Sequence, residues 1–174
     1  MEALDMPEPR VSIGLVNPKS PTNVGAVLRA SGCFQAEAVF YTGERYDRAE
    51  RFHTDTQNRA QAIPLQRVAN LIEAVPPTAK VVCVDLVDGA VPLTLFEHPA
   101  EALYIFGPED GTISQDIIDR ADDVVYIPAN GCLNLAATVN VVLYDRMSKT
   151  EHDLANNDQI LAIRDRNNRV RVKS

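Results

Sequence analysis

The amino-acid sequence predicts an α/β domain, with a mostly parallel sheet and helices on both of its faces. Short apolar runs alternate along the chain with stretches of helical periodicity, an order typical of β-α-β units. Several of these runs are nearly continuous, as expected for strands covered on both sides. The 174 residues are enough for one domain with a buried core.

The predicted elements follow one another in chain order. Strands are expected at Val11–Val16, Ala38–Tyr41, Lys80–Asp85, Ala102–Phe106 and Val124–Ile127. Helices are expected at Asn23–Cys33, Leu65–Ala74, Ser114–Arg120 and Asn134–Met147. We interpret residues 1–150 as the domain and residues 151–174 as a polar tail, whose last part, RDRNNRVRVKS, is basic.

Composition and charge exclude several classes of protein. No run approaches the ~20 apolar residues of a membrane span, and the N-terminal MEALDMPEPR lacks the apolar core of a signal peptide, so we expect a cytoplasmic protein. The cysteines and histidines show no C-x-x-C, H-x-H or H-E-x-x-H spacing, so we expect neither disulfides nor a metal site. The net charge of −7 argues against nucleic-acid binding by bulk attraction but leaves a local basic patch open.

The loop after the first strand, NPKSPTNVGAVLRA, leads into the first helix. Ligands of open α/β sheets bind at the carboxyl ends of strands, so the loops that follow strands are the candidate sites. Asn23 is a suitable N-cap, and Gly25 allows a ligand or another backbone to approach closely. The free amides of such a helix start can hold an anion such as a phosphate. The alternative is a capped helix with one solvated arginine, Arg29.

The loop after the Ala102–Phe106 strand reads FGPEDGTIS. Its glycine–proline pair ends the strand sharply, Gly111 permits a turn, and Ser114 is expected to cap the helix that follows. Glu109 and Asp110 place carboxylates at the mouth of the strand, either as hydrogen-bond acceptors or as solvated acids of a plain turn. The chain contains no G-x-G-x-x-G fingerprint here and no G-K-[ST] sequence, so neither dinucleotide nor nucleoside triphosphate binding by those routes is supported.

The loop after the Val124–Ile127 strand contains Gly131 and Cys132 in a tight turn, and Asn134 is expected to cap the next helix. That helix is apolar nearly all round and rich in small residues. It is therefore expected to be buried on more than one side, against the sheet and against a second subunit. Asn140 within it is either a buried, paired polar group or an interface contact.

Together and in this order, the three loops resemble the three motifs of the SpoU-type (TrmH-like) RNA ribose 2′-O-methyltransferases of the SPOUT superfamily. The first motif is similar to Asn-x-Gly with an arginine beyond, here Asn23, Gly25 and Arg29. The second is similar to F-G-P-E-x-x-G, here FGPEDG. The third is similar to I-P, then S-L-N and a small-residue helix, here IP and CLNLAATVNVVLYD. The resemblance extends from Val11 to Arg146.

The resemblance implies a fold, a cofactor and an assembly. The sheet's C-terminal part would form a trefoil knot, which sequence physics alone does not predict because knots are nearly absent from folds. S-adenosylmethionine would be the cofactor, and the chain would form a homodimer through the C-terminal helix, residues 134–147. The cofactor contacts that the resemblance implies by position are Val84, Leu86, Gly107, Gly111, Ile127, Cys132 and Leu133.

The catalytic residues implied by the resemblance are Arg29, Asn23, Glu109 and Asn134. The family assigns the activation of the ribose 2′-hydroxyl to the arginine. Because arginine stays protonated, we expect Arg29 to hold the adjacent phosphate and stabilise the developing alkoxide. Asn23 is expected to orient Arg29 or the ribose. Glu109 is expected to pair with Arg29 or to fix the cofactor loop.

The third motif departs from the family pattern in two ways. Cys132 stands where the family usually has serine, and a cysteine accepts only weak hydrogen bonds. The segment between Ile-Pro and this position is also shorter than usual. Both departures affect the expected contacts to the methionine end of the cofactor.

Two basic segments are candidates for RNA binding. Arg45, Arg48 and Arg51 are spaced by three and would lie along one side of a helix, with Tyr46 and Phe52 available to stack on bases. The alternative is a solvated charged segment, because acidic residues alternate with these arginines. The basic tail from Arg164 to Lys173 is equally open to both interpretations.

The predicted function is S-adenosylmethionine-dependent methyl transfer to a ribose 2′-hydroxyl of RNA, with a tRNA anticodon loop as the expected target. One alternative is a non-catalytic knotted dimer that binds RNA or a nucleoside, suggested by the shortened loop at Gly131 and Cys132. The other is an unrelated α/β enzyme acting on a small molecule, which requires the three motifs to be coincidental.

Overall fold

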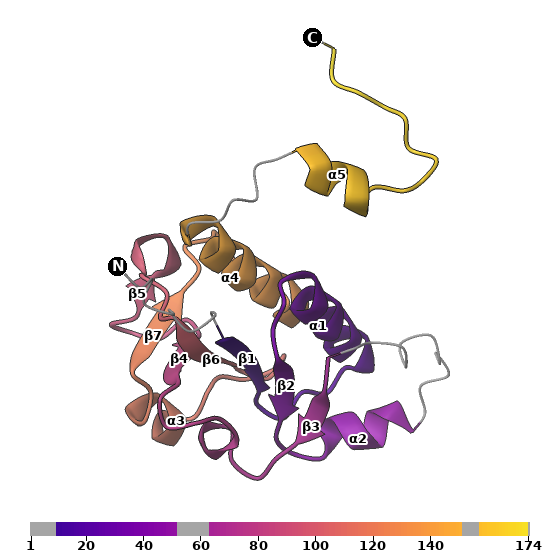
Figure 1. The fold of residues 1–174 in the computed structure, drawn as a ribbon. Helices are drawn as coiled ribbons and strands as arrows, with labels where there is room; N and C mark the ends of the chain where they lie inside the picture. Colours follow the sequence, from indigo (N-terminus) through magenta and orange to yellow (C-terminus); the bar gives the residue numbers. More distant parts are fainter. Residues whose placement is uncertain (1–9, 52–62, 151–156, 174) are drawn as a thin grey trace, which may run out of the picture.

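The computed structural model describes residues 10–51, 63–150 and 157–173. A parallel sheet of seven strands forms its centre, in the order β3-β2-β1-β6-β4-β7-β5 (Figure 1). The strands are β1 (Arg10–Leu15), β2 (Ala38–Tyr41), β3 (Leu65–Arg67), β4 (Lys80–Val84), β5 (Val91–Pro92), β6 (Glu101–Phe106) and β7 (Asp123–Tyr126). Because every pairing is parallel, the strands end at the same edge of the sheet.

Helices cover both faces of this sheet, as the sequence predicted. The α-helices are α1 (Pro21–Cys33), α2 (Arg45–Glu50), α3 (Gln115–Asp119), α4 (Leu135–Lys149) and α5 (Asn157–Ile163), with short 3-10 helices η2 (Ile72–Ala74) and η3 (Leu93–Leu95). Helices α1 and α4 lie side by side on one face, and α3 lies on the opposite face (Figure 1). In the described part of the chain, no helix has the length and apolarity needed to cross a membrane.

Alternation along the central strands divides the core into two layers. In β6, Tyr104 and Phe106 face α1 and α4, whereas Leu103 and Ile105 face η2 and α3. All four side chains are at most 1% exposed. A strand buried on both faces reads as a continuous apolar run, so the interpretation of these runs is confirmed.

The helix predicted at Leu65–Ala74 is wrong. Residues 65–67 form β3, which pairs with β2 at the edge of the sheet, and residues 72–74 form the 3-10 turn η2. The apolar residues of this segment recur at a helix-like spacing, but no helix connects them. Leu71 and Ile72 instead reach the core layer through a turn, in which the Asn70 side chain accepts a hydrogen bond from the Ile72 amide.

Helix α1 begins two residues earlier than predicted. Pro21 occupies its first turn and Ser20 is the N-cap, whose hydroxyl accepts a hydrogen bond from the Asn23 amide at 3.2 Å. The prediction that Asn23 caps this helix is therefore wrong, and its side chain is available for another contact. The capping of α4 by Asn134 is confirmed, since its side chain accepts a hydrogen bond from the Ala137 amide at 2.7 Å. The trefoil knot and the division at residue 150 stay predictions.

A buried arginine joins the end of α4 to the start of β6. The Arg146 guanidinium donates to the carbonyls of Pro99 and Ala100 at 2.6 and 2.8 Å, and to the Tyr104 hydroxyl at 3.0 Å. Its charge is therefore shared among fixed dipoles in a residue that is only 6% exposed.

His98 extends this network next to α4. Its ring nitrogens lie 2.6 Å from the Tyr104 hydroxyl and 2.8 Å from a carboxylate oxygen of Asp145. Burial lowers the pKa of His98 below its usual value and outweighs Asp145, which acts to raise it. Lys149 also lowers it and forms its own ion pair with Asp145. The histidine is therefore held neutral.

The free energy of unfolding is expected to fall as the pH drops from about 7 to about 5, in part through His98. The unfolded chain takes up a proton at this histidine near pH 6.5, whereas the folded chain resists it to a lower pH, so acid favours unfolding. His98→Gln is expected to lose about 1–3 kcal/mol at neutral pH and to flatten this pH dependence. Urea unfolding at both pH values measures it, and an equally steep dependence in the variant would contradict the assignment.

Candidate active site

A cavity of about 290 Å³ opens at the carboxyl ends of β4, β6 and β7. The segments that follow these three strands, residues 85–86, 107–111 and 127–134, form the first, second and third walls of the cavity. Every residue predicted to contact the cofactor lines it, namely Val84, Leu86, Gly107, Gly111, Ile127, Cys132 and Leu133. Three of the predicted catalytic residues line it as well, namely Asn23, Glu109 and Asn134. The structure therefore brings most of the predicted site residues to one place.

The loop after β6 turns closely past its neighbours. A Cβ at Gly107 would lie 3.3 Å from the Ile113 amide nitrogen and 3.5 Å from a carboxylate oxygen of Asp85. The Gly111 amide donates to the Pro108 carbonyl at 3.3 Å, which closes the turn. Glycine at position 107 is thus explained by this close approach, whereas the sequence had indicated only that the glycine–proline pair ends the strand.

The third wall is formed by the loop that leads into α4. Asn134 uses its side-chain oxygen for the cap, and its carbonyl accepts a hydrogen bond from the Thr138 hydroxyl at 2.9 Å. The Cys132 side chain is exposed and lines the cavity, while Leu133 is 42% exposed. This wall therefore offers apolar surface and a thiol beside a helix start.

Glu109 joins the second loop to the first. Its carboxylate accepts hydrogen bonds from the amides of Lys19 and Ser20 at 3.0 and 3.1 Å, and from the side-chain amide of Asn23 at 3.2 Å. Partial burial acts to raise the pKa of Glu109, but these bonds and one from its own amide outweigh it, so the pKa lies below its usual value. The amides expected to hold a phosphate before α1 therefore hold a protein carboxylate instead.

Asp110 reinforces the same junction from the surface. Both of its oxygens lie 2.9 Å from the Arg45 guanidinium, and the Lys19 ammonium is 3.3 Å away. These hydrogen bonds hold the pKa of Asp110 below its usual value. Arg45 also donates to the Asn17 carbonyl at 2.6 Å. The Arg45 side chain is thus engaged in contacts within the protein, at the end of β1.

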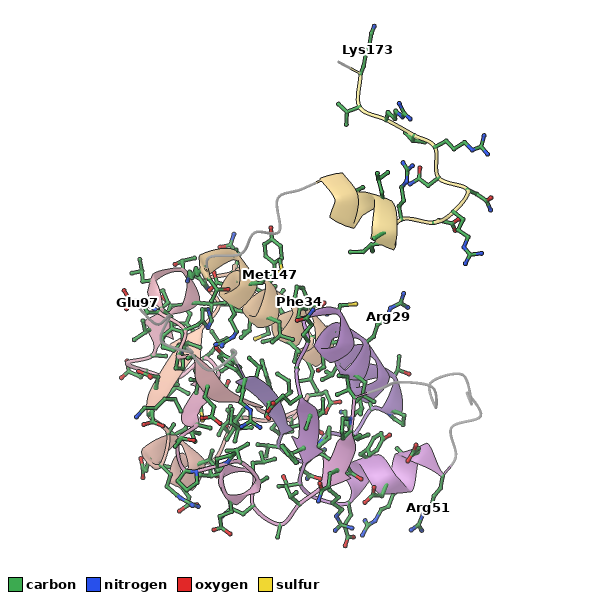
Figure 2. All side chains as sticks on the ribbon, viewed as in Figure 1. Arg29, Phe34, Arg51, Glu97, Met147 and Lys173 are labelled. Atoms are coloured by element: carbon green, nitrogen blue, oxygen red, sulfur yellow. The ribbon has the colours of Figure 1, made fainter. Side chains whose placement is uncertain are left out.

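The other members of the predicted RNA-binding segment differ in their surroundings. Arg48 is exposed and pairs with Glu44 at 2.6 Å on α2, and Arg51 is exposed at the end of that helix (Figure 2). Tyr46 is buried and contacts the ring of Tyr41 edge-on at 5.1 Å, so the expectation that it stacks on bases is wrong. Phe52 lies outside the described residues.

Arg29 does not line the cavity. It is exposed on α1 and points away from the body of the protein (Figure 2). Six residues separate it from Asn23, which corresponds to about 9 Å along a helix and to a different helical face. Glu109 contacts Asn23 and the start of α1, so of its two expected roles the pairing with Arg29 is not what the structure shows.

Three further residues that line the cavity, Asp85, Tyr126 and Thr138, were not predicted from the sequence. A signal for Asp85 existed, because it is a carboxylate placed directly at the end of a buried strand. Across the described ranges, no group of histidine, cysteine, aspartate and glutamate side chains is arranged to hold a metal ion.

Comparison with known proteins gives one family and several solved structures. A model of the SpoU rRNA Methylase family matches residues 10–144. No curated protein matches the chain significantly. An AdoMet-bound rRNA methyltransferase from Sinorhizobium meliloti shares the fold with a TM-score of 0.67 at 20% identity, over 82% of this chain and 57% of that one. The SpoU methyltransferase AviRb from Streptomyces viridochromogenes, in complex with AdoMet, gives 0.65 at 20% identity, over 85% and 62%.

A third solved structure, described by its 2-OH methylation of C/U34 on tRNA, gives a TM-score of 0.66 at 21% identity. The match covers 83% of this chain and 93% of that protein. By contrast, this chain spans less than two thirds of the length of the other two proteins. At these identities the likeness establishes the fold.

The family match rests on the sequence itself and covers most of the chain. It runs from β1 into α4 and includes all three segments that form the walls of the cavity. This chain therefore belongs to the SpoU rRNA methylase family.

Proposed function

We propose that this protein is an RNA methyltransferase that uses S-adenosylmethionine to methylate a ribose 2′-hydroxyl, with tRNA as its substrate. The observation that carries the proposal is the cavity at the strand ends, which gathers every residue that the family resemblance assigns to the cofactor. AdoMet is bound by two of the similar structures, and 2-OH methylation of tRNA is described for the third.

The cavity's lining fits such a cofactor. Apolar side chains such as Val84, Leu86 and Ile127 suit a purine ring, and strand-end backbone groups are near for its polar atoms. Among the described residues, the lining includes two carboxylates, from Asp85 and Glu109, and no basic side chain, which suits a ligand with a positive sulfonium. When bound, S-adenosylmethionine supplies an electrophilic methyl group on that sulfonium.

The protein's own groups then have to position the ribose and assist the loss of its proton. Asn23 is held by Glu109 at the rim of the cavity, so its side chain is fixed where a ribose would lie. Arg29 would hold the neighbouring phosphate and stabilise the developing negative charge on the 2′-oxygen. It stays protonated, so the proton passes to another group or to water.

We further propose that Arg29 serves the cavity of a second subunit, in a homodimer that forms through α4. Val141 and Tyr144 are 37% and 60% exposed on α4, next to the exposed Asn140. Such an apolar helix face beside α1 suits a second copy of the chain. Because Arg29 does not line its own cavity, we place it at the cavity of the partner subunit.

RNA would be held by basic groups outside the cavity. The last eighteen residues carry five arginine or lysine and two acidic side chains, a net charge of +3; since the whole chain carries −7, the rest carries −10. The tail is described from residue 157 to 173 and its basic residues are exposed or nearly so. It is therefore the stronger candidate for phosphate contacts, ahead of Arg48 and Arg51 on α2.

A non-catalytic dimer that binds RNA or a nucleoside is the second candidate. The observation that favours it is the shortened loop at Gly131, where Cys132 replaces the usual serine. Lack of S-adenosylmethionine binding in calorimetry would favour this candidate.

Arg29→Ala is expected to reduce methyl transfer from labelled S-adenosylmethionine to bulk small RNA by about 10²–10³-fold, because one stabilising cation is lost at the reacting oxygen. Nucleoside analysis identifies the product, and calorimetry is expected to show unchanged cofactor binding. Arg48→Ala is the matched control and is expected to keep most of the activity. Equal activity of Arg29→Ala and wild type would refute the role of Arg29.

Mixed dimers are expected to show that Arg29 acts across the subunit interface. Arg29→Ala and Cys132→Trp, which fills the cavity from an exposed position, should each be inactive alone. Refolding or co-expressing them together should restore about a quarter of wild-type activity, because half of the dimers then hold one complete site. No restoration would place Arg29 at the cavity of its own chain.

Tyr144→Glu should dissociate the dimer in light scattering, whereas Leu95→Glu, at another exposed apolar position, should not.

Replacing Arg169, Arg171 and Lys173 by glutamine is expected to weaken RNA binding and to flatten its salt dependence by about 0.7 per lost phosphate contact for a single-stranded target. Cofactor binding should be unchanged. Replacing the interleaved valines by threonine is the control that keeps the charge. Filter binding across a salt series measures both, and an unchanged slope would exclude the tail from the RNA interface.

A further inference from the structure

We propose that Asp85 is a positioning residue whose carboxylate holds together the cavity walls after β4 and β6, and that binding of S-adenosylmethionine depends on this carboxylate. This inference rests on the proposed function. Asp85 directly follows β4 and lines the cavity. Neither the family motifs nor the predicted site residues include it.

Asp85 contacts all three strand-end segments. One carboxylate oxygen accepts a hydrogen bond from the Leu86 amide at 2.8 Å, within the first wall. The other accepts from the Ile113 amide at 2.8 Å, in the loop after β6. The backbone amide of Asp85 donates to the Val125 carbonyl of β7 at 3.0 Å, next to the third wall. The carboxylate therefore ties the end of β4 to the loop after β6, while the backbone amide continues the pairing of β4 with β7.

The geometry around the carboxylate leaves little room for adjustment. Gly107 approaches so closely that a Cβ there would lie 3.5 Å from a carboxylate oxygen of Asp85. Ile113 is only 5% exposed and anchors its loop in the core layer that contains Leu103 and Ile105. If the bond to the Ile113 amide is lost, the loop that carries Gly107 and Gly111 is released at its far end. These two glycines line the cavity, so the cavity's shape changes with them.

Asp122 offers a matched comparison at the opposite end of the same strand. Its carboxylate accepts a hydrogen bond from the Val81 amide at 2.8 Å and pairs with the Lys80 ammonium at 2.9 Å. It is thus the same kind of carboxylate clamp on β4, but it does not line the cavity. A purely structural role of Asp85 would give both residues the same phenotype.

The test compares Asp85→Asn with Asp122→Asn in the full chain. Asp85→Asn keeps the shape but replaces one acceptor by an amide that cannot receive an N–H bond. We expect it to raise the dissociation constant for S-adenosylmethionine about tenfold in calorimetry, the effect of losing one such bond, and to speed hydrogen exchange at the Ile113 amide. Asp122→Asn is expected to leave the dissociation constant unchanged. Asp85→Ser, whose single oxygen sits on a shorter side chain, should raise the dissociation constant at least as much.

The outcomes separate this inference from the proposed function. If wild type binds S-adenosylmethionine and both Asp85 variants bind it with the wild-type dissociation constant, the inference is overturned while the function stands. If Asp85→Asn and Asp122→Asn weaken binding to the same extent, the effect reflects general stability and the inference also fails. If wild type itself gives no binding heat, the proposed function fails first. If Asp85→Asn does not fold, the dissociation constant of Asp85→Ser decides.

Discussion

The carboxylate of Glu109 is the contact around which the cavity edge of this protein is arranged. It joins two segments about ninety residues apart, because it accepts hydrogen bonds from the two backbone amides that precede α1 and from the side-chain amide of Asn23. The parallel sheet brings these segments to one edge, but a strand ladder ends where the loops begin. Beyond that point side chains have to set the loops' positions. Glu109 does so between the first and second loops, and the Asp85 carboxylate does so between the segments after β4 and β6.

This use of carboxylates gives the site its electrostatic character. Glu109 accepts neutral amide donors, so its negative charge is stabilised without a cation beside it. Asp110, one residue further on, is exposed and binds Arg45 and Lys19 at the surface. The cavity thus keeps a negative lining while the nearby cations are engaged outside it. Such a division suits a positively charged ligand inside and a phosphate chain outside.

The sequence predicted the central strands and the position of the site because both leave local signals. Continuous apolar runs mark strands buried on two faces, and the loops after β6 and β7 carry glycine and proline where the backbone must turn. Edge strand β3 was missed because its exposed residues carry no such pattern. The partners of Glu109 and Asp85 could not be predicted either. They depend on where distant backbone amides lie, and a backbone amide has no sequence signature.

The charge contrast between the tail and the rest of the chain has a consequence for selectivity. A body of net charge −10 repels nucleic acid at long range, so under the proposed function an RNA that does not engage the short basic segment would gain little by collision with this surface. Most encounters with the abundant RNA of a cell would then end quickly, and a protein with the proposed activity would rarely be sequestered by non-substrates. Fidelity in such a molecule comes partly from the weakness of unproductive encounters rather than from the strength of the correct one.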